Sequence, residues 1–148
     1  MQEYNAELEA AFKNEILQNR AKYYENVFSS RKAKQIIKHI KESYGDELEF
    51  LWLNAPNYAI FRHNNNKKWY AVLMAINESK LGLKTDNKIS IINLKAKPKS
   101  INKLIDNICY FRAYHMNKKH WISIKLDDKI AMKDLCKLVS ESYQITCN

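Results

Sequence analysis

The chain has 148 residues and a formal net charge of +9 at pH 7, with 25 Lys and Arg against 16 Asp and Glu. Hydrophobic residues make up 46% of it, enough for a core, and no apolar run approaches the roughly 20 residues that cross a bilayer. Three widely spaced cysteines argue against a disulfide framework, and the acidic start MQEYNAELEAAF argues against a secretory signal, so we expect a cytoplasmic protein that is not bound to a membrane.

Two helical patterns come first. Between residues 3 and 28, apolar side chains recur at helical spacing, namely Leu8, Phe12, Ile16, Tyr23 and Val27. Ser29 or Ser30 can cap a second helix, which Gly45 is suited to end. The first pattern is net acidic, whereas the chain as a whole is basic. We therefore predict a helical extension at residues 1–29 and one α/β domain at residues 30–148.

Four short segments rich in branched and aromatic residues come after Glu47, and they predict strands: EFLWL, YAIFR, WYAVLMAI and ISIINL. The polar link HNNNKK between the second and third is typical of a hairpin tip, and NESKLGLKTDN predicts an exposed loop before the fourth. The linking loops are too short for crossover helices, so the sheet is expected to be antiparallel.

The remainder predicts a helix, a strand and a final helix. After Pro98, the residues Ile101, Leu104, Ile105 and Ile108 share one helical face. The run YHMNKKHWISIKL then predicts a fifth strand and the polar turn at its start, and Asp127 or Asp128 is suited to begin the last helix. The predicted fold is α+β: a two-layer α/β sandwich with an antiparallel sheet, in the order α-β4-α-β-α, plus the N-terminal helix.

The positive charge is concentrated in the middle of the chain. Residues 62–125 hold fourteen Lys and Arg but only three Asp and Glu, a balance of +11 that exceeds the total for the chain. Such a concentration favours an anionic partner: nucleic acid, an acidic protein surface or anionic lipid. A lysine-rich, AT-biased genome produces the same excess without any such partner, and composition does not separate the two explanations.

The sequence offers no catalytic set. Two glycines cannot build a phosphate-cradling loop, and the cysteines show no CxxC spacing for zinc. His115 and His120 are five residues apart, which suits neither one helical face nor one face of a strand. We therefore predict no enzyme activity, no metal site and no cofactor. The competing hypothesis is a small-molecule or enzymatic site in which His63, His115 or His120 meets Arg62 in a pocket.

Basic and polar residues gather around two turns. Lysine and arginine neutralise phosphates, asparagine can pair with a base edge, and exposed aromatic rings can stack on bases. Trp69 and Trp121 flank these turns, but their bulk favours a place in the core. The predicted nucleic-acid-binding residues are Arg62, His63, Lys67 and Lys68 at the first turn, and Arg112, His115, Asn117, Lys118, Lys119 and His120 at the second.

These same stretches resemble the MmcQ/YjbR family of small bacterial proteins. The resemblance covers roughly residues 31–145 and rests on LWLNAPNYAIFRH, KKWYAVLMAI, INLKAKP and, above all, YHMNKKHWISIKLDD. It implies a two-layer fold similar to that of CyaY and of secretion chaperones. It also implies DNA binding through a double-wing arrangement of loops, and it supplies no catalytic residues.

The leading expectation is therefore a non-enzymatic protein that grips the phosphates of duplex DNA through two basic loops. The alternative is a protein-interaction or adaptor module with a chaperone-like sheet. In that case the acidic helix at residues 1–29 would mediate homodimer formation, bind a protein partner or mask the basic face.

Overall fold

The computed structural model describes residues 6–12 and 27–148. Residues 6–12 are helical, and residues 1–5 and 13–26 of the predicted N-terminal extension lie outside the described residues. Val27 and Phe28, at the end of the predicted pattern, form a turn and a bend and not a helix. From residue 27 onward the elements are α2 (Arg31–Tyr44), β1 (Tyr58–Arg62), β2 (Trp69–Asn77), the short 3-10 helix η2 (Glu78–Leu81), β3 (Lys88–Lys95), α3 (Pro98–Leu104), β4 (Tyr110–Arg112), β5 (Trp121–Lys125) and α4 (Met132–Ile145).

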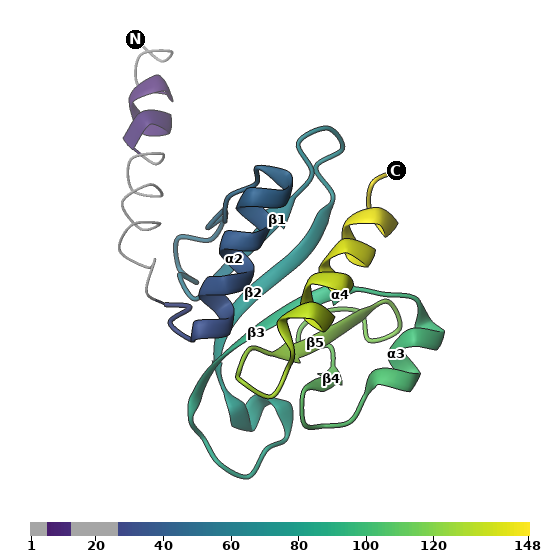
Figure 1. The fold of residues 1–148 in the computed structure, drawn as a ribbon. Coiled ribbons are helices and arrows are strands. Elements are labelled where there is room, and N and C mark those ends of the chain that lie inside the picture. Colours follow the sequence, from purple (N-terminus) through teal and green to yellow (C-terminus); the bar gives the residue numbers. More distant parts are fainter. Residues whose placement is uncertain (1–5, 13–26) are drawn as a thin grey trace.

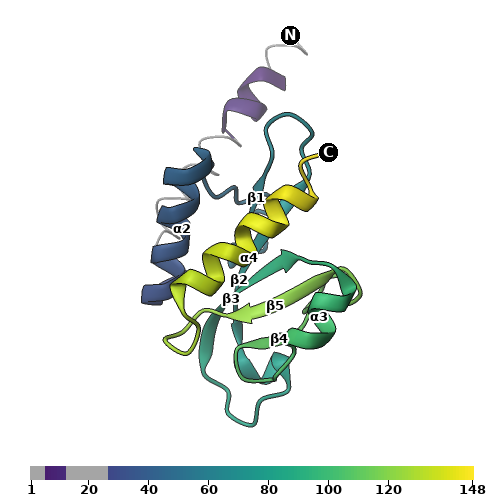
Figure 2. The same cartoon turned by 45° about the vertical axis from the view of Figure 1, so that its right-hand side comes forward.

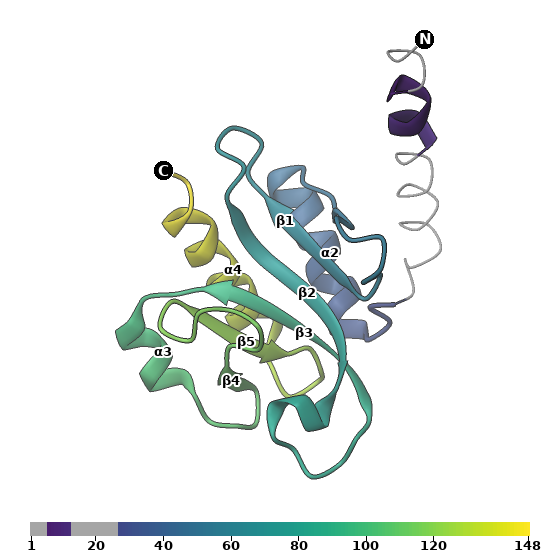
Figure 3. The same cartoon turned by 180° about the vertical axis from the view of Figure 1, so that it is seen from behind.

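The five strands form one sheet in the order β1-β2-β3-β5-β4, and every neighbouring pair is antiparallel. Helices α2 and α4 pack side by side across one face of this sheet, and α3 lies at the edge next to β4 (Figures 1 and 2). Seen from behind, the opposite face carries none of the helices α2, α3 or α4 (Figure 3). The predicted α+β fold with an antiparallel sheet is thus confirmed.

Helix α2 begins and ends where the sequence predicts. Ser30 is the N-cap, and its side-chain oxygen accepts a hydrogen bond of 3.1 Å from the backbone N–H of Ala33. Gly45 has a φ of 73° and donates its N–H to the carbonyl of Lys41, a left-handed ending that glycine adopts without steric cost.

The strands are distributed differently from the prediction, three before α3 and two after it. The segment EFLWL is not a strand, because only Glu49 pairs there, in an isolated bridge to Ile60. The helix predicted to reach Ile108 ends at Leu104, because the Asp106 carboxylate accepts hydrogen bonds of 2.9 Å from three backbone N–H groups just beyond it. The backbone then turns into β4, which sequence periodicity missed.

The start of α4 is also displaced. The sequence places it at Asp127 or Asp128, but the helix begins at Met132. The Asp127 carboxylate instead accepts a hydrogen bond of 3.0 Å from the Lys129 N–H, so it closes a turn between β5 and the helix. Aspartate is favoured both at helix caps and in such turns. The residue type therefore could not show that α4 begins later, at Met132.

The sheet separates two apolar clusters. The main core lies between the sheet and the two helices, where Ile36 and Ile40 of α2 meet Leu135 and Val139 of α4 over Phe61. A smaller cluster lies on the opposite side, which we call the helix-free face. Its fully or nearly fully buried members are Ile60, Val72, Met74, Ile76 and Ile91.

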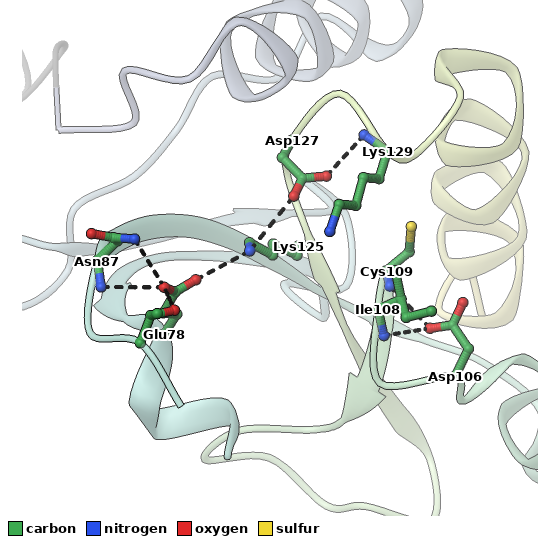
Figure 4. Close-up of polar contacts among 9 residues, drawn as sticks. Glu78, Asn87, Asp106, Ile108, Cys109, Lys125, Asp127 and Lys129 are labelled. Atoms are coloured by element: carbon green, nitrogen blue, oxygen red, sulfur yellow. Dashed lines mark hydrogen bonds and ion pairs between the residues drawn. The ribbon is translucent and has the colours of Figure 1, made fainter. Parts of the chain in front are cut away.

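A buried carboxylate closes the end of the sheet where β2 leads into η2 and the following loop. Glu78 accepts hydrogen bonds from the Thr85 hydroxyl and from Asn87, and it pairs with the Lys125 ammonium at 3.2 Å (Figure 4). Lys125 also lies 3.7 Å from a carboxylate oxygen of Asp127. The loop at residues 78–87 is therefore fixed to β5 by this ion pair.

This carboxylate makes the fold sensitive to acid. The hydrogen bond from Thr85 and the pairing with Lys125 lower the pKa of Glu78 from 4.5 to about 2, although burial opposes the shift. Between these values the unfolded chain binds the proton more readily, so stability is lost as the pH falls from 4.5 toward 2. We expect Glu78→Gln to remove this part of the acid dependence in urea unfolding measured across that interval. An equally steep loss of stability in the variant would contradict the assignment.

Candidate nucleic-acid interface

Three loops leave the sheet at the same end. Arg62 pairs with Trp69, Lys95 pairs with Trp121, and Arg112 pairs with Ile122, so β1, β3 and β4 end where β2 and β5 begin. The β1–β2 hairpin, the β3–α3 link and the β4–β5 loop consequently leave the sheet on the same side. We call this side the basic end. The sequence separates these loops by up to about fifty residues, and only the antiparallel pairing places them at the same end of the sheet.

The segments of the chain that form the basic end are rich in lysine and contain no acidic residue. The segments at residues 58–77, 88–105 and 110–126, which build it, contain no aspartate or glutamate. Among the ion pairs formed within residues 6–12 and 27–148, none involves a lysine of these loops. Lys95 is half-buried and the other lysines of the basic end are exposed. The full set is Lys67, Lys68, Lys95, Lys97, Lys118 and Lys119.

The β1–β2 hairpin is held in a fixed shape by the end of α4. The Asn66 amide donates a hydrogen bond of 2.9 Å to the Thr146 carbonyl, and the Lys68 ammonium reaches the backbone oxygen of Asn148. Lys67 has a φ of 63°, which costs about 1 kcal/mol or more for a residue other than glycine. The surrounding contacts therefore impose the turn, and Lys67 projects from a constrained position.

Two predicted residues of this hairpin have structural roles instead. His63 is only 3% exposed, and its Nε2 lies 2.8 Å from the Thr146 hydroxyl under α4. The Arg62 guanidinium donates two hydrogen bonds of 2.9 Å to the Glu49 carboxylate. As the protein stands, His63 cannot contact a phosphate, and Arg62 would have to leave a bidentate partner to do so.

The first part of the β4–β5 loop does not project as a wing, because it folds back over the helix-free face. Asn93 donates to the Tyr114 carbonyl at 2.9 Å, and the Ser123 hydroxyl donates to the Asn93 side-chain oxygen at 2.5 Å. The Tyr114 N–H donates in turn to the Ser123 hydroxyl at 2.9 Å. Asn93 and Ser123 are both fully buried, so this closed set of hydrogen bonds fastens the loop to β3 and β5.

The second part of this loop is an exposed turn. The Asn117 side-chain oxygen accepts the Lys119 N–H at 2.9 Å, so Asn117 shapes the turn. Lys118, Lys119 and His120 are exposed on it. Arg112 is exposed at the end of β4, on the opposite side of the sheet from the loop's apolar contacts. The turn thus presents two adjacent ammonium groups in a defined geometry.

His115 occupies a strained position between two tyrosines. Its φ is 61°, and its ring centroid lies 3.9 Å from that of Tyr114 and 6.4 Å from that of Tyr58. Burial, and then the neighbouring Tyr114, raise the pKa of Tyr58. His63 contacts α4 while His115 contacts this tyrosine pair, so the two histidines have separate partners. Within the described ranges, no three His, Cys, Asp or Glu side chains gather as metal ligands would.

The burial expected for Trp69 and Trp121 is only partial. Both rings pack against the smaller apolar cluster on the helix-free face, and both stay partly exposed. Trp52 contacts Trp69 in a T-shaped arrangement, with ring centroids 5.6 Å apart. These rings therefore form an outer aromatic layer over the smaller cluster.

Sequence reasoning missed Lys95 and Lys97 as members of the basic end. They lie at the end of β3, between the two predicted turns, and the Ala96 N–H donates to the His120 carbonyl at 2.9 Å. The signal was present in the basic run KAKPK, but placing it beside the other loops requires the strand order. That order depends on β4, which the sequence pattern did not reveal.

The fold and this lysine-rich end define a small α+β protein with an antiparallel sheet and a basic loop surface. The YjbR family model matches residues 41–145, and the chain belongs to the YjbR family. The uncharacterised protein YyaQ of Bacillus subtilis (strain 168) is 40% identical over 111 residues, which are 75% of this chain and 94% of YyaQ. The predicted family membership is therefore confirmed.

Solved structures agree with the fold. A crystal structure of a protein from Pseudomonas syringae matches with a TM-score of 0.74 and 36% identity, covering 76% of this chain and 97% of that one. The Deinococcus radiodurans protein DR2400 matches with a TM-score of 0.57 at 19% identity, covering 76% of this chain and 75% of that one, a similarity of fold alone. No helix in the described part of the chain is long and apolar enough to span a membrane.

Proposed function

We propose that this protein binds nucleic acid through phosphate contacts made by the basic end, as a binding protein rather than an enzyme. The observation that supports this is the position of three acid-free loops, with six lysines, at the same end of the sheet. Lysines held on constrained turns neutralise the closely spaced phosphates of a polyanion with little loss of side-chain contacts. Duplex DNA is the form that the family resemblance implies.

The lysines of the β4–β5 turn provide the direct test. The double variant Lys118→Glu with Lys119→Glu is expected to bind a labelled 20-base-pair duplex at least ten-fold more weakly at low salt. Loss of about two phosphate contacts should also make the dependence of log affinity on log salt shallower by about two. Fluorescence anisotropy across a salt series measures both quantities.

The matched control is Lys80→Glu with Lys84→Glu. These two lysines are exposed in the loop at the opposite end of the sheet, and the pair makes the same change in net charge. We expect little effect on affinity from the control. The proposal is wrong if both double variants weaken binding equally, or if the unsubstituted protein binds neither duplex nor single-stranded nucleic acid better than millimolar at low salt.

A second candidate function, a protein-interaction module, is favoured by one observation on the N-terminal helix. Leu8 and Phe12 are four residues apart in the helical stretch at residues 6–12 and are 51% and 64% exposed. Apolar side chains on one helical face are suited to a homodimer or a protein partner. Leu8→Glu with Phe12→Glu in the full chain should then change the mass measured by sedimentation. An unchanged mass at every concentration would remove this support for a homodimer.

A further inference from the structure

Aromatic and cationic side chains alternate along the helix-free face at the basic end. Trp69 begins β2 and Trp121 begins β5, and both pack on the smaller apolar cluster of this face. Lys95 lies on β3 between them and is the direct partner of Trp121. Strand alternation puts Lys95 on the same face as Ile91, a member of that cluster. Tryptophan, lysine and tryptophan thus stand at the same end of three strands that are neighbours in the sheet, although β2 and β3 are no longer paired at Trp69.

The two rings differ in how they are placed. Trp121 is paired directly with Lys95, whereas Trp69 lies on β2 beyond the last β2–β3 pair, Ala71 and Leu94. Trp52 packs against Trp69 and so restricts the orientation of that ring. Lysines adjoin both rings in the sequence: Lys67 and Lys68 directly precede Trp69, and Lys118 and Lys119 precede Trp121 by two or three residues.

Such a surface discriminates between forms of nucleic acid. In a duplex the base faces are stacked on one another, and a protein reaches only the phosphates and the base edges in the grooves. In a single strand the base faces are available to partly exposed aromatic rings, while lysines contact the phosphates. Rings that lie against a sheet, as Trp69 and Trp121 do, cannot enter a groove but can receive an unpaired base.

We propose that the helix-free face at the basic end binds single-stranded nucleic acid, with bases stacked on Trp69 and Trp121 and phosphates held by Lys95 and the lysines of the adjoining loops. This rests on the proposed function and specifies its ligand. A second copy of the chain suits the face less well, because self-association would bring the lysines of two basic ends together without acidic partners in these loops. A polyanion satisfies both the rings and the lysines.

The test compares three ligands on the unsubstituted full-length protein: a 15-nucleotide oligothymidylate, an abasic strand of the same length, and a 15-base-pair duplex. Stacking contributes roughly 5- to 150-fold per base, so the oligothymidylate should bind at least ten-fold more tightly than the abasic strand and more tightly than the duplex. It should also quench tryptophan fluorescence, which the abasic strand should not do. The abasic strand retains the phosphates, so the comparison isolates the bases.

Single substitutions then locate the stacking. Trp69→Leu should weaken oligothymidylate binding roughly ten-fold and leave abasic binding unchanged. Tyr110→Leu is the matched control, because Tyr110 is a half-buried aromatic residue that packs against the main core on the helix-covered side. Circular dichroism confirms that each variant is folded.

The outcomes separate this inference from the function on which it rests. Equal affinity for the oligothymidylate and the abasic strand would overturn base stacking and leave phosphate binding intact. No binding to any of the three ligands would overturn both. If Trp69→Leu alters the sedimentation mass but not oligothymidylate affinity, the face is a self-association surface and the inference is wrong.

Discussion

Replacing Ser142 with alanine is expected to lower the free energy of unfolding by about 3 kcal/mol, a large effect for the loss of one oxygen atom. Ser142 lies in α4 and is fully buried. Its hydroxyl donates to the Tyr70 carbonyl at 2.5 Å and accepts the Lys95 N–H at 2.9 Å. The variant leaves both backbone groups buried without a partner, and each such group costs roughly 1–3 kcal/mol.

The position of these groups explains why the cost is high. The β2–β3 ladder ends with the pair Ala71 and Leu94, and Tyr70 and Lys95 are the next residues along each strand. Here the Ser142 hydroxyl stands where the next direct backbone hydrogen bond would form, so it links α4 to both strands as they separate. The β1–β2 hairpin diverges from β3 beyond this point (Figure 1).

The matched control is Ser140→Ala, the same change on the exposed face of the same helix. Alanine has the highest helix propensity, so this control should be neutral or slightly stabilising. Urea unfolding monitored by circular dichroism measures both variants. If the two changes cost the same, the Ser142 hydroxyl does not bridge α4 to the two strands.

The elements that the sequence predicted well are those whose signals are local. The caps of α2 at Ser30 and Gly45 depend on a few neighbouring residues, and the strands β1, β2 and β3 are indicated by runs of branched and aromatic side chains. The predictions that were wrong concern segments whose residue pattern fits two different local structures. Residues 49–53 are rich in aromatic and branched side chains, as a strand is, but their chain leaves the sheet after the single bridge at Glu49.

The candidate site was predictable only in part, because its assembly depends on contacts distant in sequence. A histidine in a polar turn that also carries two lysines looks like a phosphate ligand, yet His63 is buried, with its ring against the Thr146 hydroxyl 83 residues away. Conversely, Lys95 appears in the sequence as the end of a strand, and only the strand order places it between two tryptophans. The residue types predicted that phosphate groups could be bound, whereas the fold decides which of these residues are exposed at the candidate site.

The second large effect is expected at Asn93. Asn93→Ala removes the acceptor of the Ser123 hydroxyl and the donor to the Tyr114 carbonyl in a fully buried site, and it should lower the free energy of unfolding by about 3 kcal/mol. Ser123→Ala alone should cost about 2 kcal/mol. The double variant should cost less than the sum by about 1–2 kcal/mol, because the two side chains act as one network.

The control for this cycle is Asn102→Ala, the same change at an exposed position of α3, which should alter stability by less than about 0.5 kcal/mol. Equal costs at positions 93 and 102, or strictly additive costs at positions 93 and 123, would show that the hydrogen bonds between Asn93 and Ser123 do not stabilise the fold as a network.

This network fastens the loop that carries Lys118 and Lys119. Its loss should therefore also weaken the proposed binding of nucleic acid. Amide hydrogen exchange in residues 113–120 should accelerate in Asn93→Ala more than exchange in β2, since the loop loses its attachment to β3 and β5. Nucleic-acid affinity should fall with it, because the two lysines must then be ordered at the moment of binding. Faster exchange with unchanged affinity would mean that the fixed shape of this turn is not required for binding.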